Sequence, residues 1–134
     1  AGGEHLNAAR DFGKNFGIAY QLRNDYLDYF GEENITGKNI VEDLSEGKST
    51  LPLIHSFNSS NEQDQKDIKE IFNGKIISKA GKLLEIFKQN KSDIYTQEQI
   101  NKYSNQAIKS LEIFEGKDKD MLVELTKLCT QRTR

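Results

Sequence analysis

The sequence predicts an all-α fold, and two observations favour helices over strands. Proline, which interrupts helices, occurs only at Pro52. Apolar residues recur at a period near 3.6 in several segments, whereas the alternation typical of strands is missing. The chain has 134 residues, the length of one ordinary domain. We therefore expect a single helical domain over residues 1–134.

The first helix is predicted over residues 4–30. Its apolar face comprises Leu6, Ala9, Phe12, Phe16, Ala19, Tyr20 and Leu27. Gly13 and Gly17 lie one turn apart within it, and each costs roughly 1 kcal/mol of helix propensity relative to alanine. Close approach of another helix would offset that cost, and fraying of the helix is the alternative.

The middle of the chain alternates between polar connections and shorter helices. Residues 31–50 are predicted to form a polar loop punctuated by glycines. A short apolar helix is expected over residues 51–57, where Pro52 suits a first helical turn. Charged amphipathic helices follow over residues 62–72 and 78–89.

Two helices are predicted in the last third of the chain. Thr96 and Gln99 have the spacing of a capping box, so the first should open at Thr96, run through Phe114 and end at Gly116. The second should span residues 118–130. The residues expected to point inward from it are Leu122, Leu125 and Leu128.

The charge and composition of the chain argue against nucleic-acid and membrane partners. Nineteen basic residues stand among twenty-one acidic ones for a net charge of −2, with no basic stripe for nucleic acid and no polybasic membrane patch. No apolar run approaches the roughly 18 residues that span a bilayer. Cys129 is the only cysteine, which excludes an internal disulfide and fits a reducing, cytoplasmic location. The chain does not open with methionine, so we expect residues upstream, and an organellar location stays open.

Carboxylates gather at the end of the first predicted helix and in the loop after it. Gln21, Asn24, Asp25 and Asp28 are three and four residues apart, which places them on one helix face. Between residues 24 and 48 there are seven acidic residues and two lysines. Carboxylates bind Mg²⁺, Mg²⁺ binds phosphate oxygens, and lysine adds a point charge for the same phosphates. The pattern indicates a site for a metal–diphosphate complex, and a solvated acidic face is the alternative.

Other motifs fail on spacing. Gly47-Lys48-Ser49 resembles the end of a nucleotide-binding P-loop, but Glu42 occupies the position of its first glycine. Asp25 does not begin a calcium loop, because Leu27 stands at the third position. His5 and His55 lack partner ligands in the sequence, and His55 is expected to be a packed or surface residue.

Two ordered motifs resemble the trans-isoprenyl diphosphate synthases, also called polyprenyl synthetases. Residues 16–28 read F-G-I-A-Y-Q-L-R-N-D-Y-L-D, similar to the second aspartate-rich motif, G-x-x-F-Q-x-x-D-D-x-x-D. Downstream, Gly37-Lys38 and residues 42–52, E-D-L-S-E-G-K-S-T-L-P, resemble the G-K…D-L-x-E-G-K-x-T-L-P element. The E-D-L-x-E-G-K element and residues 52–56 most resemble eukaryotic-type geranylgeranyl diphosphate synthases, and some longer-chain synthases share this sequence. The resemblance implies the C-terminal helices of an isoprenoid-synthase-type bundle.

The resemblance also implies a reaction and its metal. Family members join isopentenyl diphosphate to an allylic diphosphate, which ionises with the help of Mg²⁺ ions, and they are usually dimers. By position, Asn24 would ligate one Mg²⁺ directly, Asp25 and Asp28 would act mainly through metal-bound waters, and Asp43 would support those waters.

Four residues are implied at the substrate. Gln21 should lie near the allylic substrate, Lys38 should contact its diphosphate, and Lys48 should add positive potential nearby. These three are the implied catalytic residues. Tyr20 takes the position of a phenylalanine that lines the hydrocarbon tunnel.

Two departures from the family pattern leave alternatives open. Asn24 replaces an aspartate, and the first D-D-x-x-D motif is not in these residues. We therefore expect the 134 residues alone to be inactive. The first hypothesis is a piece of a Mg²⁺-dependent short- to medium-chain prenyltransferase that works as a homodimer. The second is a non-catalytic or regulatory subunit of a heteromeric synthase, and a terpene cyclase is the third.

Overall fold

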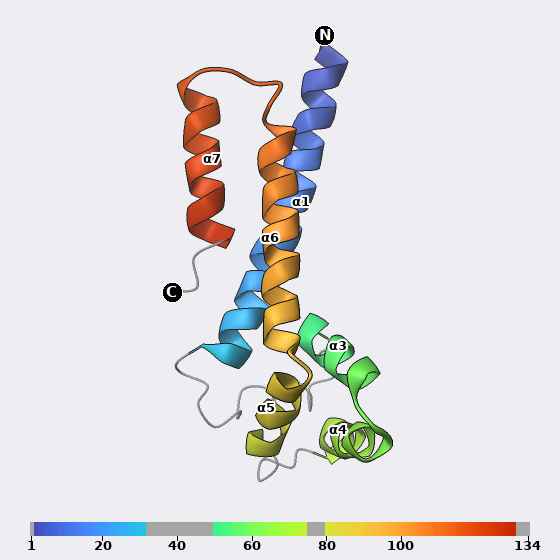
Figure 1. Cartoon of the computed structure of the whole chain (residues 1–134). Coiled ribbons are helices and arrows are strands. Elements are labelled where there is room, and N and C mark those ends of the chain that lie inside the picture. Colours follow the sequence, from blue (N-terminus) through green and yellow to red (C-terminus); the bar gives the residue numbers. More distant parts are fainter. Residues whose placement is uncertain (1, 32–49, 75–79, 131–134) are drawn as a thin grey trace. The chain divides into compact units, whose positions relative to one another are not determined.

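The computed structural model describes residues 2–31, 50–74 and 80–130, and within them every regular element is a helix (Figure 1). The all-α prediction is therefore confirmed. The helices are α1 (Gly2–Phe30), α3 (Leu51–Ser59), α4 (Glu62–Gly74), α5 (Ala80–Gln89), α6 (Ser92–Ser110) and α7 (Lys117–Thr130). The predicted helix boundaries before residue 90 that fall on described residues agree with these to within about two residues, the usual uncertainty of helix ends. The predicted start at residue 78 lies outside the described residues.

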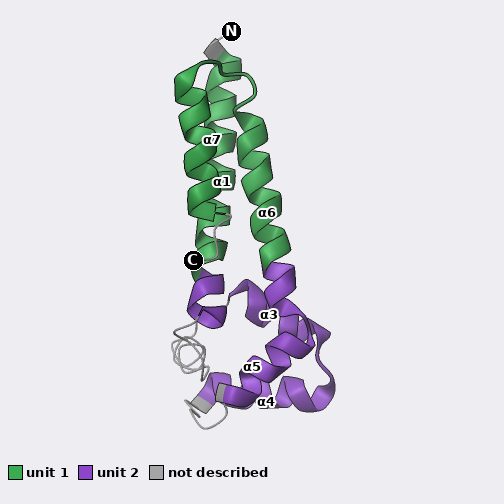
Figure 2. Cartoon of the chain, turned by 60° about the vertical axis from the view of Figure 1, so that its left-hand side comes forward, with its two compact units in different colours: residues 1–24, 97–134 green, residues 25–96 purple. Residues whose placement is uncertain are grey.

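The chain divides into two compact units (Figure 2). Unit 1 comprises Ala1–Asn24 and Gln97–Arg134, and unit 2 comprises Asp25–Thr96. The single helical domain expected from the sequence stays a prediction.

Unit 2 has a continuous hydrophobic core. The last turn of α1 and helices α3, α4 and α5 each contribute to it. Its buried members are Tyr29, Leu53, Ile68, Ile71, Leu83, Ile86 and Phe87. On α4 and α5 these positions recur at spacings of three and four, which explains why short, charged segments fold as helices here.

In unit 1, hydroxyl groups mediate the packing of α7 against α6. The Oγ of Ser104 and the Oγ1 of Thr130 are 2.6 Å apart, and both residues are buried. Thr126 is also buried and donates from its hydroxyl to the carbonyl of Leu122, one turn back. Small hydroxyl side chains that bond to their own helix or its neighbour leave no buried polar group unpaired.

This packing corrects the predicted inward face of α7. Leu125 and Leu128 were expected inside, but they are 44% and 48% exposed. Each residue turns an α-helix by about 100°, so Leu128 lies about 200° from Thr126, on the opposite side. Leu122, half-buried, is the one predicted residue that shares the face of Thr126 and Thr130.

The predicted ends of the helix that corresponds to α6 were also wrong. Helix α6 begins at Ser92, and Thr96 lies inside it, where its hydroxyl donates to the Ser92 carbonyl at 2.7 Å. The helix ends at Ser110, because the next amides bond three residues back, as in the 3.0 Å bond from Phe114 to Leu111. Gly116, at φ 95°, follows this turn and begins the approach to α7.

The structure does not show the helix contact predicted for Gly13 and Gly17. A Cβ added at either position would meet no heavy atom within 4 Å in the described part of the chain. Both positions are exposed on α1. Glycine is therefore not required by packing against α6 or α7.

An ion pair joins α4 to α5 at the edge of the unit 2 core. The Nζ of Lys82 lies 2.6 Å from Oδ2 of Asp67, and the Asp67 side chain is 7% exposed whereas that of Lys82 is 50% exposed. The hydrogen bond from Lys82 to Asp67, followed by their Coulomb attraction, raises the pKa of the lysine above its ordinary value of 10.5. A buried carboxylate depends on such a partner.

We predict that Lys82→Met destabilises the chain at neutral pH, because Asp67 would then be buried without its cation. The raised pKa means that the contribution of Lys82 is complete below pH 10.5 and is lost as the pH rises through the folded-state value. Thermal unfolding followed by circular dichroism should show a lower midpoint for the variant at pH 7 and a shrinking difference above pH 10.5. Lys88→Met, also on α5, is the control, and an equal loss in both variants would contradict the prediction.

Candidate functional site

Helix α1 carries the candidate site residues that the structure describes. One ridge of neighbouring side chains, each four residues after the last, runs along it. Its members are Phe12, Phe16, Tyr20, Asn24 and Asp28. The adjacent ridge carries Gln21 and Asp25. The spacing expected from the sequence is thus realised on one continuous helix.

The first half of this ridge is aromatic. The ring centroids of Phe12 and Phe16 are 5.6 Å apart, and those of Phe16 and Tyr20 are 6.1 Å apart at an interplanar angle of 12°. Tyr20 is 44% exposed, so its ring offers an apolar surface rather than filling a core. Tyr20 was expected on the apolar face of the helix. Its role in lining a hydrocarbon tunnel stays a prediction.

The second half of the ridge is polar and lies at the C-terminal end of α1. Asn24 and Asp25 are half-buried, and Asp28 is exposed. The last turn of α1 contains no basic residue. A helix C-terminus carries a partial negative charge of its own, so carboxylates there favour a bound cation. The amide and carboxylate oxygens are hard donors of the kind that Mg²⁺ prefers.

The polar end of α1 is anchored by aromatic packing one turn later. Tyr29 is 1% exposed, and its ring centroid lies 6.3 Å from that of Phe87. Phe30 packs against the same ring at 6.2 Å. The backbone amide of Gly31 donates to the carbonyl of Leu27 at 2.8 Å, and a Cβ on Gly31 would clash with that carbonyl oxygen. The turn that carries Asp25 and Asp28 is therefore held in phase by the core of unit 2.

Helix α3 begins just after residues 32–49, the lysine-bearing segment that contains Lys38 and Lys48, and α3 is anchored in unit 2. Thr50 and Pro52 are buried at its start, and Leu53 belongs to the core. The side-chain amide of Asn90 donates to the hydroxyls of Ser56 and Ser60, at 2.9 Å each. Both flanks of residues 32–49 are thus fixed in unit 2.

His55 is a packing residue, as expected from the sequence. Its Nδ1 lies 2.8 Å from the Oγ of Ser92, which is fully buried, and its ring stacks on Tyr95 at a centroid distance of 4.2 Å. These contacts fasten α3 to the start of α6.

Lys38, Asp43 and Lys48 lie in residues 32–49, outside the described residues, and so their expected roles stay predictions. Among residues 2–31, 50–74 and 80–130, no three His, Cys, Asp or Glu side chains come together as a group that could hold a metal ion. Asp25 and Asp28 supply two carboxylates, and Asn24 supplies an amide.

Sequence reasoning missed the residues that hold the site in place. Tyr29, Phe87 and Asn90 carry no motif, and their roles depend on contacts across long stretches of chain. A periodicity signal existed for Tyr29, which lies three residues after Tyr26, but nothing local identified Phe87 as its partner.

Comparison with known proteins identifies the family. The Polyprenyl synthetase family model matches residues 1–90. The chain is 35% identical over 127 residues to an octaprenyl diphosphate synthase of Haemophilus influenzae, covering 93% of this chain and 39% of the relative. It is 31% identical over 130 residues to an all-trans-nonaprenyl-diphosphate synthase of Rhodobacter capsulatus, covering 96% of this chain and 40% of that protein. The chain belongs to the polyprenyl synthetase family.

Solved structures agree with this assignment. A geranylgeranyl pyrophosphate synthase from Lactobacillus brevis matches 95% of this chain and 39% of its own with a TM-score of 0.84 and 26% identity. A geranylgeranyl pyrophosphate synthetase from Pyrococcus horikoshii matches 96% of this chain and 40% of its own at a TM-score of 0.82 and 30% identity. The chain thus spans about two-fifths of the length of these proteins. None of the helices in the described part is long and apolar enough to cross a membrane.

We predict that Phe87→Ala destabilises the chain by about 3–5 kcal/mol, because it removes a fully buried ring and leaves a cavity beside Tyr29 and Phe30. Urea unfolding followed by circular dichroism measures the change. Met121→Ala, at a residue 56% exposed, is the control and should change stability little. Similar losses in the two variants would contradict the anchoring role of Phe87.

Proposed function

We propose that this chain supplies the second aspartate-rich motif of a Mg²⁺-dependent prenyltransferase that condenses isopentenyl diphosphate with an allylic diphosphate. The observation that carries the proposal is the ridge on α1, which passes from stacked aromatic rings to oxygen ligands within one helix. An allylic diphosphate has the same polarity, with a hydrocarbon chain followed by a charged head. Membership of the polyprenyl synthetase family supports the reaction class.

Each residue has a proposed part. Tyr20, stacked on Phe16, lines the hydrocarbon chain, and Gln21 orients the allylic group. Asn24, Asp25 and Asp28, together with Asp43, hold Mg²⁺ or its bound waters. Bound Mg²⁺ supplies charge neutralisation for the departing diphosphate.

Lysine provides the rest of the positive charge. Lys38 binds the allylic diphosphate, and Lys48 adds positive potential at the same place, where charge develops as the carbon–oxygen bond breaks. The anchoring of Tyr29 and Leu53 in one core supports this arrangement, since it fixes both flanks of the segment that carries these lysines.

The relatives named above differ in their products, so the family assigns a reaction class and not a chain length. We propose a short- to medium-chain product, because the wording of residues 42–56 resembles geranylgeranyl diphosphate synthases. We also propose that the complete enzyme is a homodimer.

A second candidate function rests on Asn24. An amide where the family pattern has a carboxylate removes one negative charge from a proposed metal ligand. In a non-catalytic or regulatory subunit of a heteromeric synthase that loss would be tolerated, since a partner subunit would perform the reaction.

Lys38→Ala tests the proposed reaction in a full-length synthase containing this chain. We expect turnover to fall by about ten- to a hundredfold, because a charge-assisted contact is worth about 1.5–3 kcal/mol. The measurement is incorporation of labelled isopentenyl diphosphate with geranyl or farnesyl diphosphate as primer. Lys14→Ala, at an exposed position of α1, is the control. Equal rates for the two variants would remove Lys38 from the site.

Asn24→Asp separates the two candidate functions. In an enzyme the added carboxylate should lower the Mg²⁺ concentration at half-maximal rate, and Asn24→Ala should reduce turnover, because each changes a metal ligand. Titration of Mg²⁺ against initial rate measures both effects. Superimposable curves for the three proteins would exclude Asn24 as a ligand. Turnover that appears only with a partner subunit, whatever residue stands at position 24, would favour the regulatory subunit.

A further inference from the structure

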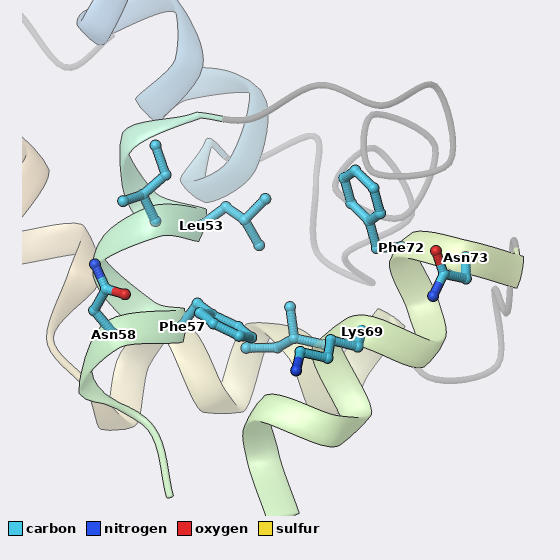
Figure 3. A pocket seen from close by; sticks show the side chains of 8 residues that line it. Leu53, Phe57, Asn58, Lys69, Phe72 and Asn73 are labelled. Atoms are coloured by element: carbon cyan, nitrogen blue, oxygen red, sulfur yellow. The ribbon is translucent and has the colours of Figure 1, made fainter. Parts of the chain in front are cut away.

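Helices α3 and α4 enclose a pocket of about 330 Å³ within unit 2 (Figure 3). Its apolar lining comprises Leu53, Ile54, Phe57, Ile68 and Phe72. Ile54 and Phe72 are 47% and 38% exposed, so the pocket opens to the surface. Its volume falls at the lower end of the roughly 300–1,000 Å³ typical of small-molecule sites. None of these lining residues belongs to α1 or to residues 32–49, which carry Lys38 and Lys48.

Among the described lining residues, Lys69 is the one cation. Lys69 lines the pocket from α4, and its Nζ lies 5.6 Å from the centroid of the Phe57 ring on α3. This cation–π contact holds the ammonium group across the pocket. The remaining polar residues that line it in the described part of the chain, Asn58 and Asn73, are neutral amides, and none of the described lining residues is acidic. Figure 3 shows Lys69 and Phe57 reaching toward each other from the two helices.

We propose that this pocket is a second binding site for a prenyl diphosphate, an identification of the ligand that rests on the proposed function. The hydrocarbon chain lies against Leu53, Phe57 and Phe72, and its burial drives binding. The diphosphate lies at the open side, where the Lys69 ammonium group donates hydrogen bonds to it. The described lining residues include one cation and no anion, so an anionic amphiphile matches the charge of this lining as well as its apolar surface.

We expect binding here to need no metal, because the described residues that line the pocket include no carboxylate to hold one. This separates it from the proposed site on α1, where carboxylates and Mg²⁺ act together. A prenyl diphosphate can therefore occupy the pocket under conditions that disable the α1 site.

Calorimetric titration of the 134-residue chain with farnesyl diphosphate in EDTA tests the proposal. We expect saturable binding, and we expect Lys69→Gln to weaken it about tenfold while farnesol binding stays unchanged. Phe72→Ser should weaken both ligands, since it removes part of the apolar wall. Lys66→Gln, an exposed lysine of the same helix that does not line the pocket, is the matched control and should change nothing.

Several results would overturn the proposal. Absence of binding in EDTA, or equal effects of Lys69→Gln and Lys66→Gln, would exclude this pocket as a prenyl diphosphate site. Palmitate that binds as tightly as farnesyl diphosphate would show a general site for anionic amphiphiles. Dimers that Phe72→Ser converts to monomers would show that a second copy of the chain fills the pocket. None of these results depends on turnover, so they do not bear on the proposed reaction.

Discussion

The burial of two aromatic rings at the end of α1 is the interaction on which the candidate site depends. Tyr29 and Phe30 both pack on Phe87, and Tyr29 is almost completely removed from solvent. A helix rotates by about 100° per residue, so fixing the direction of residue 29 also fixes the directions of Asp25 and Asp28. A hydrophobic contact therefore sets the geometry of a polar site.

The same core also holds α3, the helix that follows the lysine-bearing segment. Leu53 joins Tyr29 in one cluster, and α3 is fastened further by the contacts of His55 with Ser92 and of Asn90 with Ser56. Ser92 begins α6 and Asn90 lies between α5 and α6, and neither residue belongs to a recognised motif. Residues outside the motifs thus hold α1 and α3, the two helices that carry or adjoin the motifs.

The helices and the α1 site could be predicted because their signals are local. The period of apolar residues indicated α1, and the spacing of Gln21, Asn24, Asp25 and Asp28 needed only that period to share a face. The errors arose where partners are distant. Thr96 resembled a helix N-cap, but α6 starts four residues earlier, at Ser92, whose hydroxyl is hydrogen-bonded to His55. Leu125 and Leu128 were expected inside by hydropathy, yet α7 turns its threonines toward Ser104, because two hydroxyls can bond at 2.6 Å where two leucines could not approach.

If Mg²⁺ binds at this site as proposed, the amide at Asn24 has opposite effects on the empty helix and on the metal-loaded one. An aspartate there would stand four residues before Asp28, at the end of α1 where the helix dipole is already negative. Such a like-charge pair costs an isolated helix about 0.2–0.5 kcal/mol, so the amide relieves a small repulsion when no cation is bound. With Mg²⁺ bound as proposed the balance would reverse, because a carboxylate at ligand distance attracts a divalent cation far more strongly than two carboxylates one turn apart repel each other. The loss on binding therefore exceeds the gain in helix stability, so relief of repulsion alone does not explain the amide in an enzyme that relies on this metal.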